Sequence, residues 1–164
     1  MGRISTKKDK TVYQQSRENM GLSRDKASEL LEGISSDRIE RIENETSIPH
    51  PDEVLIMSEK YKAPYLCNYY CSNQCPIGSE YVPEITITDF NRIILQLLSS
   101  LNAMHKKQER LIEIAGDGKV DIDEMDDFVA IQKDLEKISV TVEALQLWTE
   151  QMKAEGGFNS DSHK

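Results

Sequence analysis

The sequence predicts an all-α protein, and three observations lead to this prediction. Hydrophobic residues make up 38% of the 164-residue chain but aromatic residues only 6%, a composition that favours aliphatic helix packing over a β-sandwich. In the second half of the chain, apolar residues recur at spacings of three and four, which is the period of a helix with one buried face. In the first third, glycines, prolines and serines separate segments short enough to be single helices.

The first third of the chain divides into four short helices. Gly21 ends the first helix, and Ser23 is placed to cap the second, because its hydroxyl can accept a hydrogen bond from an unpaired first-turn N–H. Gly33 lies in the next turn, and Ser35 or Ser36 caps the third helix. Two prolines then precede a fourth helix, since proline is tolerated at a helix start but not in its interior.

The block 85–154 has the clearest periodicity and predicts two long helices. The first apolar stripe consists of Phe90, Ile94, Leu97, Leu101, Met104, Gln108 and Leu111, in which only Gln108 is polar. The second consists of Phe128, Ile131, Leu135, Ile138, Val142, Leu145, Trp148 and Met152. Because only a short turn around Gly116–Gly118 separates them, the two helices are expected to form an antiparallel hairpin.

Part of this chain is similar to the helix-turn-helix pattern of a known family. The matching stretches are GLSRDKASELL at 21–31, GIS at 33–35 and DRIERIE at 37–43. Together with the following Pro-led helix they resemble the lambda-repressor/Cro-like (XRE-type) family over residues 13–66. The sequence departs from the family pattern by having Ala27-Ser28 in place of Leu-Ala and an extra Glu32 before the turn. The resemblance implies a five-helix helix-turn-helix domain at 11–66.

The resemblance also implies a function, which is sequence-specific binding of double-stranded DNA by a transcriptional regulator. The outward face of the recognition helix is then expected to carry Ser36, Asp37, Arg38, Glu40 and Arg41. Residues Ser23 and Arg24 lie where such domains contact phosphate. Glu43 is expected to turn inward and hold the helix and its following loop.

The distribution of charge places any DNA contact in the first half and leaves an alternative open. Residues 1–66 carry a net charge of −1 and residues 67–164 a net charge of −8. DNA repels the acidic second half. Carboxylates on the recognition helix also oppose phosphate binding, unless they accept hydrogen bonds from cytosine. The alternative is therefore a helical protein-interaction module that has lost DNA binding.

Three cysteines, Cys67, Cys71 and Cys75, are spaced by four residues and would line one face of a helix. This spacing differs from the usual zinc and iron–sulfur patterns, so no metal or cofactor is expected and buried packing is favoured. A thiol or metal sensor is the remaining alternative. An enzyme is not expected, because the three histidines, His50, His105 and His163, have no nucleophile or metal motif beside them.

The predicted organisation has five parts. They are a basic arm at 1–10, the helix-turn-helix domain at 11–66, a Cys/Tyr/Pro-rich connector at 67–84, the hairpin at 85–154 and a disordered tail at 155–164. Each hairpin helix has one apolar stripe, so pairing of two copies into a four-helix bundle would complete the hairpin, with packing against the first domain as the alternative. No apolar run approaches the roughly 18 residues that span a bilayer, so a cytoplasmic protein without membrane contact is expected. The bundle of two hairpins would make this protein a homodimer.

Overall fold

The computed structural model describes residues 10–157, and these residues form eight helices and no strand. The all-α prediction is therefore confirmed for this part of the chain. The predicted basic arm, except Lys10, and most of the predicted tail lie outside the described residues. None of the described helices is long and apolar enough to cross a membrane. The described residues divide into two compact units, 10–84 with 150–157 and 85–149.

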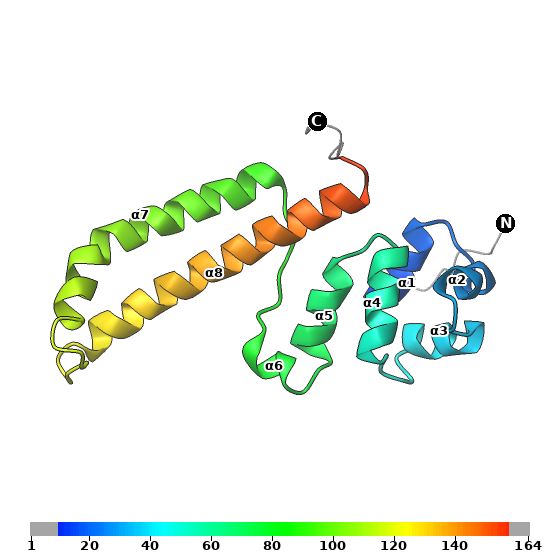
Figure 1. Ribbon diagram of the computed structural model, residues 1–164, viewed down its shortest axis with the longest axis horizontal. Helices are drawn as coiled ribbons and strands as arrows, with labels where there is room; N and C mark the ends of the chain where they lie inside the picture. The colour runs from blue at the N-terminus through cyan, green and yellow to red at the C-terminus, as the bar shows by residue number, and fades with distance from the viewer. Residues whose placement is uncertain (1–9, 158–164) are drawn as a thin grey trace, which may run out of the picture. The chain divides into compact units, whose positions relative to one another are not determined.

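The first unit contains six helices (Figure 1). They are α1 (Val12–Asn19), α2 (Arg24–Leu31), α3 (Ser36–Glu43), α4 (Pro51–Lys60), α5 (Tyr65–Asn73) and α6 (Gly78–Tyr81).

Side-chain hydroxyls begin the first three helices. Thr11, Ser23 and Ser35 each accept a hydrogen bond from the backbone N–H three residues later, at 3.2–3.3 Å. The predicted caps Ser23 and Ser35 are thus confirmed. Helix α2 ends at Glu32, which has a left-handed backbone with φ 41°, and Gly33 follows with φ 125°. The extra residue before the turn is therefore accommodated by two consecutive residues with positive φ.

The core of the first unit draws on α1 to α5. Its buried members are Tyr13, Ala27, Leu31, Ile34, Ile39, Ile42, Val54, Met57, Tyr61, Ala63 and Leu66. Helix α5 contributes the fully buried Leu66, and Tyr69 and Tyr70 pack against the same core. The Tyr13 hydroxyl also lies 2.8 Å from Oε1 of Gln74, to which it donates a hydrogen bond. The domain boundary placed at residue 66 thus falls inside α5, and residues 67–84 belong to the same compact unit as the four preceding helices.

Two long helices, α7 (Phe90–Ile114) and α8 (Met125–Ala154), dominate the second unit and run side by side in opposite directions (Figure 1). The Asp89 carboxylate caps α7 by accepting from the Arg92 backbone N–H at 3.0 Å. Lys107 joins the helices through a 2.7 Å ion pair with Asp134. Arg110 and Asp127 form a second pair at 2.8 Å. We call α7 and α8 the helix pair.

The buried row of α7 differs from the predicted stripe. Ile93 and Ile114 are buried, whereas Phe90 and Leu101, both predicted stripe members, are 43% and 45% exposed. Apolar residues cover more of α7 than one row, so spacing alone could not show which row α8 covers. The buried side of α7 is therefore rotated about the helix axis relative to the predicted stripe, and part of that stripe faces solvent.

Gly78 provides a test of how tightly α5 and α6 pack. A Cβ atom at this position would lie 2.2 Å from the Cys71 backbone carbonyl oxygen, far inside van der Waals contact. We therefore expect Gly78→Ala to lower the free energy of unfolding by about 1–3 kcal/mol, the usual range for overpacking. Urea unfolding followed by circular dichroism would measure the loss. The exposed neighbour Glu80 provides the control Glu80→Ala; equal stability of both variants would contradict the close approach.

Candidate nucleic-acid interface

Helix α3 is the predicted recognition helix, and its residues alternate between core and solvent. Ile39 and Ile42 are buried at 1% exposure, which fixes the inner face of the helix against the core of the first unit. Asp37, Glu40 and Arg41 are exposed. The outer face of α3 therefore presents two carboxylates and one guanidinium.

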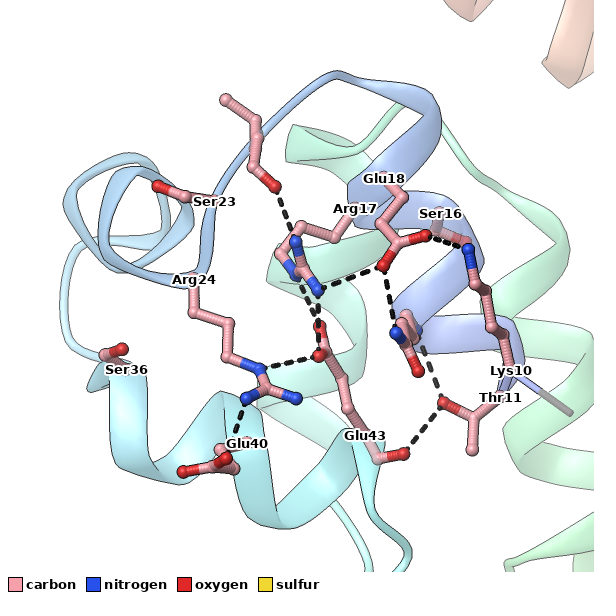
Figure 2. A network of polar contacts seen from close by, with 12 residues as sticks. Lys10, Thr11, Ser16, Arg17, Glu18, Ser23, Arg24, Ser36, Glu40 and Glu43 are labelled. Carbon is pink, nitrogen blue, oxygen red and sulfur yellow. Dashed lines mark hydrogen bonds and ion pairs between the residues drawn. The ribbon is translucent and has the colours of Figure 1, made fainter. Parts of the chain in front are cut away.

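A buried ion pair connects α1 to the end of α3 (Figure 2). Arg17 Nε and Nη2 donate to the two carboxylate oxygens of Glu43 at 2.5 and 2.9 Å. Both side chains are at least 92% buried. Burial lowers the pKa of Arg17, but the hydrogen bonds and charge of Glu43 outweigh it and raise the pKa overall. The inward orientation expected for Glu43 is confirmed, and its partner is the α1 arginine.

Arg24, predicted to contact phosphate, lies across α2 and α3 (Figure 2). Its Nε donates to Glu43 at 2.9 Å and its Nη1 donates to Glu40 at 2.7 Å. The Ser23 hydroxyl caps α2 by accepting a hydrogen bond from the Lys26 backbone N–H. The Ser36 hydroxyl donates to Asp25 at 2.9 Å. Arg24 and Glu40 thus bond to each other, whereas the hydroxyls of Ser23 and Ser36 bond to Lys26 and Asp25, so all of these predicted site residues already have partners within α2 and α3.

Arg38 is half-buried and turns toward the beginning of α4. Its Nε and Nη2 donate to the two carboxylate oxygens of Glu53 at 2.8 and 2.6 Å. Its Nη1 donates to the Ser47 hydroxyl and its Nη2 also to the Ile48 carbonyl. These bonds occupy most of the five donors of a guanidinium. They also lower the pKa of Glu53, mainly through the hydrogen bond from Arg38.

Arg41 is therefore the predicted site cation that keeps its guanidinium available. Within residues 10–157 it forms no ion pair, whereas Arg24 and Arg38 are both paired with carboxylates. The arrangement can donate hydrogen bonds from Arg41 and accept them through Asp37 and Glu40. It offers polar recognition over a small, nearly neutral surface.

Sequence reasoning did not identify Arg17 and Glu53 as members of this network. The Glu53 carboxylate accepts from the His50 backbone N–H at 2.7 Å, three residues earlier, which is a cap contact that the spacing could have indicated. No local pattern signals that Arg38 reaches the same carboxylate. The pairing of Arg17 with Glu43, across 26 residues of sequence, likewise leaves no signal in the spacing.

The three cysteines lie on α5 and just beyond it. Cys67, Cys71 and Cys75 are free and half-buried, and burial raises the pKa of the Cys71 thiol. The Cys75 Sγ atom accepts from the Gly78 backbone N–H at 3.4 Å. In the described part of the chain, no group of three or more His, Cys, Asp or Glu side chains is arranged to hold a metal ion. Cys67 packs against the core of the first unit.

Comparison of the chain with protein-family models, curated proteins and solved structures finds no match. The resemblance to the lambda-repressor/Cro-like family stays a prediction from the sequence.

The buried pair Arg17–Glu43 predicts a large effect of a small substitution. Glu43→Gln keeps the shape of the side chain but removes the charge that Arg17 contacts most closely, which leaves the buried guanidinium with only the Glu18 carboxylate, 3.8 Å away. We expect a loss of about 3–5 kcal/mol in the free energy of unfolding, typical of breaking a buried ion pair. Glu40→Gln is the matched control, because this carboxylate is 51% exposed. Chemical denaturation of both variants at pH 7 gives the comparison, and equal losses would contradict a central role for Glu43.

The Arg38–Glu53 contact predicts a dependence of stability on pH. Because the pKa of Glu53 is lowered in the folded state, its contribution is present above the unfolded value of about 4.3 and is lost as pH falls through the folded value. Glu53→Gln should therefore destabilise the protein at pH 7 and flatten the decline in stability between about pH 5 and 3. Glu59→Gln, at an exposed position of the same helix, should keep the wild-type slope. Thermal unfolding across this range would measure both slopes, and a Glu53→Gln slope as steep as that of the wild type would refute the assignment.

Proposed function

We propose that the first unit contains a helix-turn-helix domain of the lambda-repressor/Cro-like type, which binds double-stranded DNA in a sequence-specific manner. The observation that carries this proposal is α3, whose outer face is open while Ile39, Ile42 and Glu43 fix its inner face. A helix held in this way can enter a major groove without reorganising. The proposed role is that of a cytoplasmic transcriptional regulator.

The beginnings of α2 and α3 support contact with the DNA backbone. Ser23 precedes α2 and Ser36 opens α3, so both helix starts have hydroxyls as well as backbone N–H groups. Helix N-termini attract phosphate through unpaired N–H groups and the helix dipole. In the proposed complex these ends contact phosphate, and Asp37, Glu40 and Arg41 face the base edges.

The proposal includes a homodimer formed through the helix pair acting as an antiparallel hairpin. A single small helix-turn-helix domain, which we call the reader domain, buries a limited surface on DNA and contacts few phosphates. Two copies joined by their hairpins would contact two half-sites, and linking the two binding events raises the overall affinity.

A second candidate function is a protein-interaction module, and the charge of α3 favours it. Asp37 and Glu40 are exposed, and the guanidiniums of Arg24 and Arg38 are already paired with carboxylates. Such a surface suits a partner with basic side chains better than a phosphate backbone. The two functions differ in their ligand and can be separated by direct binding measurements.

The test of DNA binding starts with the whole protein and a pool of random duplexes at low salt. We expect selection to enrich one sequence, and Arg41→Ala to weaken binding to it by about 1–3 kcal/mol if the guanidinium contacts a base. Arg92→Ala, at an exposed position on α7, is the control and should bind like the wild type. Fluorescence anisotropy with the selected duplex would measure all three affinities.

Two outcomes would count against sequence-specific DNA binding through α3. Failure to enrich any sequence would favour the protein-interaction module. Enrichment with equal affinities of Arg41→Ala and the wild type would show that α3 is not the reading helix.

A further inference from the structure

The helix pair has two unlike sides, which can be recognised from the order of residues around each helix. On α7 the covered positions include Ile93 and Leu97, and on α8 they include Asp134 and Thr141. Because each residue advances about 100° around a helix, residues just before and just after these positions lie on opposite sides of the seam between the helices.

The residues that precede the covered positions form a polar side. Gln96 and Ser99 of α7, together with Lys133, Lys137 and Val140 of α8, line one shared groove of about 630 Å³. Since residues from both helices meet in this groove, the preceding positions of α7 and α8 lie on the same side of the pair. The following positions therefore share the other side.

The residues that follow the covered positions form an apolar face. We define this face by Ile94, Leu98, Leu101 and Ile112 of α7 with Leu135 and Val142 of α8. Leu98 is 52% exposed, Ile112 is 63% exposed and Leu135 is 46% exposed, so the described residues of the second unit leave them uncovered. The positions between them are His105, Gln108, Gln132 and Ser139, so none of these ten positions is Asp, Glu, Lys or Arg, and the carboxylates of Glu136 and Glu143 border the face through hydrogen bonds from Gln132 and Ser139.

We propose that a second copy of this chain covers the apolar face, so that two helix pairs pack into a four-helix bundle. A helix of 25 residues is about 37 Å long, and two neighbouring helices present a width of about 20 Å. The resulting area of about 700 Å² per copy is close to the roughly 800 Å² per partner of a stable protein interface. A face without charged residues can also meet its own copy across a two-fold axis without placing like charges together.

The proposal that a second copy covers the apolar face rests on the proposed DNA-binding dimer. It specifies which side of the helix pair forms the dimer contact. It keeps Leu135 and Val142 of the predicted α8 stripe. On α7 it keeps Ile94 and Leu101 of the predicted stripe and adds Leu98 and Ile112. Leu97, a member of that stripe, is half-buried on α7, whereas the neighbouring Leu98 faces outward. The exposed Leu95, at 67%, lies outside the apolar face and outside the covered row.

The test compares the same substitution at three exposed leucines of the full-length protein. Light scattering should give a dimer for the wild type at tens of micromolar. Leu98→Glu and Leu135→Glu should raise the dimer dissociation constant by about 100-fold or more, because each dimer would bury two carboxylates. Leu95→Glu should remain a dimer with the wild-type constant. Circular dichroism would verify that helix content is retained, and Leu98→Gln replaces Leu98→Glu if the charged variant unfolds.

The outcomes separate this assignment from the proposed DNA binding. A monomeric wild type, or dimers of Leu98→Glu and Leu135→Glu as stable as the wild type, would overturn it whatever the DNA affinity. A monomeric wild type that still binds the selected duplex would leave the DNA-reading proposal intact. A dimer lost in the two face variants but without affinity for any duplex would retain the apolar face as the interface and remove the reader.

Discussion

The buried pair between Arg17 and Glu43 is the interaction on which the arrangement of the first unit depends. It joins the last turn of α1 to the end of α3, and both side chains are withdrawn from water. A charge in that environment is tolerated only with its partner in place. Arg17 also donates to the Leu22 carbonyl in the α1–α2 connection, and Arg24 donates to the same Glu43, so α1 and α2 share one carboxylate. Displacing α3 relative to α1 or α2 would leave buried polar groups unsatisfied.

The local features of this unit could be predicted from the sequence, while its polar network could not. A serine directly before a helical pattern identifies Ser23 as a cap, and Ser35 or Ser36 as the next one, because the hydrogen bond to the N–H three residues later is contained in one turn. The carboxylate partners of Arg24 and Arg38 lie 15 to 19 residues away in the sequence. Their pairing depends on tertiary placement, and the outward orientation expected for Arg38 did not take its reach toward Glu53 into account.

The helix pair illustrates a different limit of sequence reasoning. Spacings of three and four correctly indicated two long helices, because the apolar residues of α7 cluster on one part of the helix surface. However, two adjacent apolar rows satisfy the same spacings. The predicted row and the covered row of α7 both contain Leu97, so they differ by less than the 100° between consecutive residues, and only the position of α8 decides between them. That choice also determines which row remains exposed.

The internal pairing of Arg24 and Arg38 has a consequence for how fast the proposed reader could find DNA. Rapid association with DNA relies on a positive field that attracts the phosphates from a distance. Here the net charge of the chain is −9. Of the cationic side chains on α2 and α3, only Lys26 and Arg41 form no ion pair within the described residues. Without steering, protein associations proceed at about 10⁵–10⁶ M⁻¹s⁻¹. A reader of this kind would search slowly and select its site through the lifetime of the complex rather than the rate of encounter.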